Sequence, residues 1–444
     1  MRMTTLNARF ALAMFSLSGL AHSAPYTDPT LLDVPWGNYS FIRQGWRGYL
    51  ETIPAVSYLN GLGVVWGQSP QSKSADEIAA ALAWAGFRRV RLEIPWGSVK
   101  CDESGLDDVD AVRTAQILRA LKAHGLRPLI LLNANHLQPC PVRWRDLLVQ
   151  APAAAGSRSL IVTGDLRNIQ HYAATLMSLA NGGTAGPLIT NHSPVRASVG
   201  GAQMIELSKP LARAISGGEV LRLALLRYQP LYPVGTPAFE RTVNGWLHYA
   251  SLVANLVKAD YGSDDFDIEI WNELTFGSAF LSVDNYADSK TVIGDVSESF
   301  HPGGRAWELA ERTVETLKHE HADVKIIWGF SNTTFFHVPI AQLPPYLDGQ
   351  SYHPYGTGRR CYADLVRDRR SLLLDEYVPT GCVVQPEGYA QAWQQTESLL
   401  RFLTPSARSV HPPGSQEFQH YITEHGFAPA EIGIMDRREA EAKS

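Results

Sequence analysis

The chain has 444 residues, a net charge of -5, 45% hydrophobic residues and 19% charged residues. This composition indicates a globular chain of one large or two ordinary domains and excludes a disordered or coiled-coil protein. The near-neutral charge argues against nucleic acid as a partner. The 4 cysteines exclude a disulfide scaffold but allow one or two bridges in an oxidising compartment.

The first residues of the chain have the pattern of a signal peptide. Arg2 and Arg9 precede or border an apolar run over residues 10–20, and the small residues Ala21 and Ser23 follow at the minus-three and minus-one positions of a cleavage site. A membrane span needs about 20 apolar residues, roughly twice the length of this run. We therefore predict that residues 1–23 are removed on export, that the protein is secreted or periplasmic, and that it has no membrane span.

Short apolar runs then alternate with helical patterns, which is typical of parallel strands connected by helices. Ser74 and Glu77 form a capping box at the start of the first helix, and helices are also predicted over Val109–Leu121 and around residues 243–257. The predicted strands are Gly61–Gly67, Arg89–Pro95, Arg127–Asn133, Phe266–Trp271, Val324–Phe330, Gly349–His353 and Gln419–Thr423. This α/β order favours a TIM (β/α)8-type barrel over an open doubly wound sheet, because no Gly-x-Gly-x-x-Gly turn follows the first strand.

The alternation breaks after the third strand. Apolar runs at residues 160–162, 204–207 and 220–227 are separated by Gly-rich turns, so we predict a β-rich insertion over 151–236. The predicted domain organisation is a signal peptide over 1–23 and a barrel over 24–444 that this insertion interrupts.

Polar residues close three of the predicted strands, at the end of a barrel where chemistry takes place. The fourth strand ends in Trp271-Asn272-Glu273, the sixth in His353-Pro354-Tyr355, and the seventh in Thr423-Glu424-His425-Gly426. Two glutamates therefore close strands on nearly opposite sides of one predicted barrel mouth.

This arrangement resembles clan A of the glycoside hydrolases, and within it the β-xylosidase and iduronidase branch. The resemblance covers roughly residues 60–135 and 238–430, and it implies a retaining barrel enzyme that acts on a polysaccharide or glycoside without a cofactor. The chain departs from the clan at Leu274, where proline is commoner, and the insertion has no counterpart that we can place.

The resemblance implies a role for each matching residue. Glu424 matches the nucleophile and Glu273 the acid/base, held about 5 to 5.5 Å apart in retaining enzymes. An ionised Glu424 would raise the pKa of Glu273 and keep it protonated until the sugar esterifies Glu424. Asn272 would bind the sugar 2-hydroxyl, and Arg91 would brace Glu424.

Other residues near strand ends are candidates for sugar binding, each with a structural alternative. His353 and Tyr355 match the strand-six pair of the clan. The further candidates follow strand three or lie at or near the ends of strands two and five: Asn135, His136, Trp96 and Trp328. A satisfied structural histidine and core packing of the tryptophans are the alternatives.

Two other functions stay open. His136, His353 and His425 could surround a divalent metal in a hydrolase, although none has a second histidine four residues on. The barrel could also bind a glycan without cleaving it. The sugar, its linkage and endo or exo action are left open by the sequence.

Two further expectations concern the cysteines and the chain end. Cys101 and Cys140 follow strands two and three, which are adjacent in a barrel, so we predict a disulfide between them. Cys361 and Cys382 share the loop after strand six, and we predict a second disulfide there. After Glu424 only a short segment follows, with no pattern of an eighth strand, so we expect a truncated barrel of reduced stability and activity. The alternative is that the segment before Asn60 or part of the insertion supplies the eighth strand.

Overall fold

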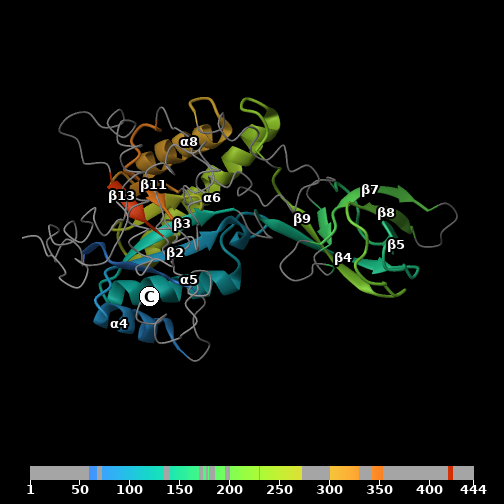
Figure 1. Cartoon of the computed structure of the whole chain (residues 1–444), viewed down its shortest axis with the longest axis horizontal. Coiled ribbons are helices and arrows are strands. Elements are labelled where there is room, and N and C mark those ends of the chain that lie inside the picture. Colours follow the sequence, from blue (N-terminus) through green and yellow to red (C-terminus); the bar gives the residue numbers. More distant parts are fainter. Residues whose placement is uncertain are drawn as a thin grey trace, which may run out of the picture.

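The computed structural model contains two β-sheets, a parallel sheet covered by helices and a separate antiparallel sheet (Figure 1). The described residues are 60–67, 73–134, 140–169, 174–176, 179, 186–195, 201–229, 231–272, 301–329, 343–353 and 419–423. All statements below concern this part of the chain.

The parallel sheet has seven strands in the order β1-β2-β3-β10-β11-β12-β13, and each neighbouring pair is parallel. Each strand lies within a segment that the sequence predicted, which confirms those seven predictions. Their bounds are β1 Gly63–Val65, β2 Arg89–Pro95, β3 Arg127–Asn133, β10 Asp267–Ile270, β11 Lys325–Gly329, β12 Gly349–Tyr352 and β13 Gln419–Ile422.

Helices pack on one face of this sheet. They are α4 (Ala75–Trp84), α5 (Asp108–Ala123), α6 (Pro237–Tyr261) and α8 (Arg305–Glu320), with a short 3-10 helix, η3, at Trp96–Ser98. The predicted capping box is present, since Glu77 N donates to Ser74 Oγ and Ser74 N donates to the Glu77 carboxylate. Even-numbered strand residues, among them Val90, Ile268 and Ile326, form the buried core under these helices.

The other face of the sheet is turned inward and is partly charged. Side chains alternate along a strand, so the odd-numbered residues of β10, Asp267 and Glu269, lie opposite the core. Arg91 of β2 bonds Glu269, and Tyr421 of β13 bonds Asp267. Because β2 and β13 are not neighbours of β10, these bonds require the sheet to curl around its inner face. The fold is therefore α/β with a curled parallel sheet.

The antiparallel sheet occupies the chain between β3 and α6, and Figure 1 shows it at the far side of the molecule from the parallel sheet. Its core consists of its own apolar residues, such as Leu160, Ile205 and Leu223. Its six strands, in the order β6-β9-β4-β5-β8-β7, are β4 Val142–Val149, β5 Ser159–Thr163, β6 Ala174–Leu176, β7 Ile189–Pro194, β8 Gln203–Leu207 and β9 Val220–Leu226.

This sheet begins before residue 151, where the sequence placed the start of the insertion. Strand β4 contains Arg143, Arg145 and Asp146 and its first half is largely solvent-facing, so its apolar pattern is weak. Pairing with β9 along its length holds it in the sheet. For β4, pairing with a distant strand therefore decides the structure in spite of the weak local strand pattern.

The predicted disulfide between Cys101 and Cys140 is not formed. Cys140 is buried just before β4, and its Sγ atom lies 3.8 Å from the Pro141 carbonyl oxygen and 4.0 Å from the Tyr228 carbonyl oxygen. Cys101 is partly exposed, and its carbonyl oxygen accepts a hydrogen bond from Arg227. The prediction assumed that adjacent loops bring their thiols together, and Cys140 instead packs into the core. Cys361 and Cys382 lie outside the described residues.

Residues 1–23 also lie outside the described part of the chain. Within the described part, none of the helices combines the length and apolarity that crossing a membrane would require.

Candidate active site

Three of the predicted site residues, Arg91, Asn272 and His353, belong to one hydrogen-bonded network on the inner face of the parallel sheet. Arg91 Nε donates to Glu269 Oε2 at 2.6 Å, and Arg91 Nη2 donates to Asn272 Oδ1 at 2.7 Å. Glu269 is 0% exposed and Arg91 is 6% exposed. The arginine of β2 thus joins the middle of β10 to the turn that follows it.

The second carboxylate oxygen of Glu269 points toward strands β12 and β13. Ser351 Oγ of β12 donates to Glu269 Oε1 at 2.5 Å, and Thr423 Oγ1, just after β13, donates to the same oxygen at 2.9 Å. His353 Nε2 lies 3.1 Å from Thr423 Oγ1. We call this set the Glu269 network; its members are Arg91, Glu269, Asn272, Ser351, His353 and Thr423.

A second group of paired charges on the same face of the sheet is centred on Asp267, the residue two positions before Glu269. Asp267 is buried and accepts from Arg89 Nη1 at 2.8 Å and from Arg127 Nη2 at 2.6 Å. Tyr421 Oη lies 3.3 Å from Asp267 Oδ2, and burial, followed by the Asp267 charge, raises the pKa of Tyr421. Removing one partner of a buried ion pair leaves the other charge uncompensated and costs about 3 to 5 kcal/mol, so loss of either Arg91 or Glu269 would destabilise the arrangement of the strands.

The backbone after β10 is strained. Trp271 is buried and has a φ of 75°, in the left-handed region that residues with a side chain rarely adopt. Its N–H still donates to the Leu132 carbonyl oxygen at 2.9 Å, while its own carbonyl group points at Gly329 of β11. A Cβ atom at Gly329 would overlap that carbonyl oxygen. Glycine at this position therefore permits the turn that delivers Asn272 to Arg91.

The two candidate glutamates lie outside the described residues, as do Tyr355, Asn135 and His136. The described residues immediately before the two glutamates, Asn272 and Thr423, both belong to the Glu269 network. The predicted contact of Arg91 with Glu424 stays a prediction; in the described part of the chain Arg91 bonds Glu269 and Asn272.

The two tryptophans proposed to bind sugar are both fully buried. Trp96 stacks between Tyr228, at a ring distance of 4.9 Å, and Tyr249, at 5.9 Å. Trp328 is an even-numbered residue of β11 and belongs to the core under the helices, opposite the face that bears Glu269. Their contacts favour core packing, the alternative that the sequence left open.

Sequence reasoning did not single out Glu269, Ser351 or Thr423 as site residues. The signal for Glu269 is present in β10, where Asp267 and Glu269 alternate with two isoleucines. Charged residues at every second position of a fully buried strand indicate an inner face that must be ion-paired. The identity of the partners cannot be read from the strand itself.

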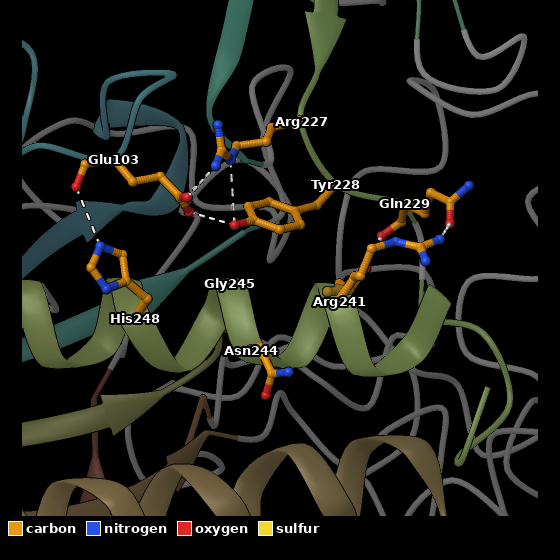
Figure 2. A pocket seen from close by; sticks show the side chains of 9 residues that line it. Glu103, Arg227, Tyr228, Gln229, Arg241, Asn244, Gly245 and His248 are labelled. Carbon is orange, nitrogen blue, oxygen red and sulfur yellow. Dashed lines mark hydrogen bonds and ion pairs between the residues drawn. The ribbon is translucent and has the colours of Figure 1, made fainter. Parts of the chain in front are cut away.

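A separate pocket of about 500 Å³ lies beside α6 (Figure 2). Glu103, which has a φ of 63°, accepts from Tyr228 Oη at 2.5 Å and pairs with Arg227 at 2.6 Å. His248 Nε2 lies 3.3 Å from the Glu103 carbonyl oxygen. Burial, followed by the bond to Glu103, raises the pKa of Tyr228 to about 12. These contacts fasten the end of the antiparallel sheet to the loop after β2, and the pocket is lined by none of the predicted site residues.

No group of three or more His, Cys, Asp or Glu side chains suited to a metal ion occurs in the described ranges. His136 and His425, two of the three histidines in the metal hypothesis, lie outside the described residues. The third, His353, contacts Thr423 Oγ1 through its Nε2 atom.

Comparison with known proteins gave no matching family model and no matching curated protein. Among solved structures, the chain is similar to an exo-β-1,4-mannosidase of Opitutaceae bacterium strain TAV5, with 14% identity, a TM-score of 0.37 and coverage of 85% of this chain and 56% of that chain. A family 39 glycoside hydrolase of Bacteroides cellulosilyticus WH2 shows 13% identity, a TM-score of 0.37 and coverage of 84% and 50%. A β-glucosidase of Thermotoga maritima shows 12% identity, a TM-score of 0.34 and coverage of 79% and 65%.

These three structures are glycoside hydrolases, and the chain spans about half the length of the first two.

Proposed function

We propose that the protein is a retaining glycoside hydrolase of the TIM (β/α)8 type, in which the seven described parallel strands form the curled sheet of the barrel. Glu424 attacks the anomeric carbon of the sugar, and Glu273 protonates the departing oxygen. Once the sugar is esterified to Glu424, Glu273 accepts a proton from water and the glycosyl ester is hydrolysed. The substrate class is a polysaccharide or glycoside, and the reaction needs no cofactor.

One observation supports this proposal most directly. The residues that precede the two glutamates in sequence, Asn272 and Thr423, are linked through two buried side chains, Arg91 and Glu269. The segments that bear the glutamates therefore start from one small region, although 154 residues separate Glu269 from Thr423. A double displacement requires two carboxyl groups on either side of one bond, and this convergence favours such a pair.

The remaining predicted residues receive roles that fit this reaction. Asn272 is fixed by Arg91 through its side-chain oxygen. Because an amide oxygen accepts, its NH₂ group stays available to donate to a sugar hydroxyl. His353 and Tyr355, with Asn135 and His136, would line the sugar site at the ends of strands six and three. Discrimination between sugars would rest on such hydrogen bonds, because a buried polar group left unpaired by the wrong sugar is costly.

The proposal is tested with Glu424→Gln and Glu273→Gln, and with Glu206→Gln as a matched control on an exposed position of β8. Aryl glycosides with good and poor leaving groups are the substrates. Loss of the nucleophile should abolish turnover of both. Loss of the acid should spare the good leaving group, since it needs no proton, and azide should restore part of the turnover by replacing water.

Equal loss on both substrates in the two variants would contradict the assigned roles. Binding of glycans by the unaltered protein without hydrolysis would instead support a non-catalytic glycan-binding barrel. A loss of activity on treatment with a strong chelator would support the metal-dependent alternative.

We also propose that the protein is exported and that residues 1–23 are cleaved. The support is the order of positive charge, apolar run and small residues at the amino terminus. Amino-terminal sequencing of the protein from the periplasm or the culture medium of expressing bacteria should begin at Ala24, and an uncleaved cytoplasmic product would refute the proposal.

A further inference from the structure

We propose that Glu269 is a positioning residue that sets both the place of the two catalytic segments and the direction of the hydrogen bonds that reach His353. This inference rests on the proposed function for its catalytic consequence. Its first test does not require activity, because the bond directions follow from the chemistry of the contacting groups.

The direction of each bond is determined by its participants. Arg91 has donors and no acceptor, so Glu269 Oε2 must accept from it. An ionised carboxylate only accepts, so the hydroxyl proton of Thr423 points to Glu269 Oε1. A hydroxyl has one proton, and Thr423 Oγ1 has therefore none left for the imidazole. The 3.1 Å contact then requires His353 Nε2 to hold a proton and donate it to Thr423.

The consequence for the reaction is that one buried carboxylate controls two chain segments. Through Arg91, Glu269 holds Asn272, the residue before Glu273. Directly, it holds Thr423, the residue before Glu424. Glu269 itself reaches neither substrate nor reacting atoms in this scheme, and it acts through Arg91 and Thr423.

The substitution Glu269→Gln tests the bond directions with little change in size. Because Arg91 can only donate, the new amide must turn its oxygen toward Arg91 and its NH₂ group toward Ser351 and Thr423. Thr423 Oγ1 then accepts from the amide, which frees its hydroxyl proton for His353 Nε2. We expect the imidazole to release the Nε2 proton in order to accept this bond.

The measurement is the protonation of His353 Nε2 by nitrogen-15 NMR of the imidazole ring, with the signal assigned from a His353→Gln sample. We expect a protonated Nε2 in the unaltered protein and an unprotonated Nε2 in Glu269→Gln. An unprotonated Nε2 in the unaltered protein, or a protonated Nε2 in Glu269→Gln, would overturn the proposal.

Asp267→Asn is the matched control, because Asp267 lies two residues earlier on the same face of β10 and is also buried and paired with arginine. Its two carboxylate oxygens each face an arginine, so the amide NH₂ group has to meet a donor. We therefore expect Asp267→Asn to lower the melting temperature more than Glu269→Gln does, while His353 keeps its Nε2 proton. Tyr421→Phe is a milder change beside Asp267 if Asp267→Asn does not fold.

For kcat we expect the opposite order, with a larger loss in Glu269→Gln than in Asp267→Asn. A displacement of about 1 Å at a reacting group can cost about 100-fold in rate, so Glu269→Gln should lower kcat by up to about 100-fold with a nearly unchanged KM. Asp267→Asn, or Tyr421→Phe, should retain most of kcat. A larger loss of kcat in Asp267→Asn or Tyr421→Phe than in Glu269→Gln would overturn the positioning role of Glu269. If the unaltered protein hydrolyses no glycoside, the proposed function fails, and the His353 measurement still decides the bond directions.

Discussion

The substitution Gly245→Ala probes how the helix α6 supports the junction between the two sheets. Gly245 is buried, and a Cβ atom built there would lie closer than 3.0 Å to three atoms of Tyr228, with the phenol oxygen at 2.5 Å. That oxygen donates to the Glu103 carboxylate at 2.5 Å, and the Tyr228 ring stacks on Trp96. The added methyl group therefore cannot be accommodated without moving the tyrosine.

The cost follows from the contacts that the movement disturbs. The nearest ring atom, Tyr228 Cζ, would lie 2.1 Å from the added Cβ atom, so the ring must retreat by about 1.4 Å to reach a van der Waals separation of about 3.5 Å. Overpacking of this kind costs about 1 to 3 kcal/mol. Losing the hydrogen bond to the Glu103 carboxylate adds about 1.5 to 3 kcal/mol, and alanine returns about 1 kcal/mol of helix propensity. We expect a net loss of about 1.5 to 5 kcal/mol in the free energy of unfolding.

The assay is urea unfolding followed by tryptophan fluorescence, since Trp96 and Trp246 both pack in this cluster. The control is the same substitution in a Tyr228→Ala background, where the clash is gone. There Gly245→Ala should stabilise the protein by about 1 kcal/mol, the helix propensity of alanine over glycine. An equal loss in both backgrounds would refute the reasoning, because the cost would then not arise at Tyr228.

Three further outcomes are expected. Gly329→Ala should destabilise the protein by more than about 1 kcal/mol in the same urea assay, because its methyl group would overlap the Trp271 carbonyl oxygen, and a neutral result would contradict the tight approach. Ser74→Ala should cost about 1 kcal/mol by removing the cap that Glu77 completes, and substituting Asp instead should retain most of the stability. The folded-state pKa of Tyr228 is raised to about 12 from 10.0, so the stability that this shift contributes is complete below pH 10 and is lost as the pH rises toward 12. In Tyr228→Phe the free energy of unfolding should therefore fall less steeply between pH 10 and pH 12. The same pH dependence in the variant and the unaltered protein would contradict the raised pKa.

The sequence determined the features that depend on neighbouring residues. Strands such as β3 and β11 could be predicted because a short apolar run ends at a turn. The capping box at Ser74 and Glu77 could be predicted because both bonds form within one helical turn. The alternation of Asp267 and Glu269 with isoleucines also marks which side of β10 is charged, since side-chain direction has a fixed period of two.

The tertiary structure decided which side chains meet. The partners of Glu269 are separated from it by 178 residues at Arg91, by 82 at Ser351 and by 154 at Thr423. No local pattern encodes such pairs, because they depend on strand register and on the curl of the sheet. The same register placed Trp328 in the core instead of at the strand mouth, and packing directed Cys140 away from the predicted disulfide. Strand identity follows from local hydrophobicity, whereas the partner of a buried charge is set by how distant strands close on one another.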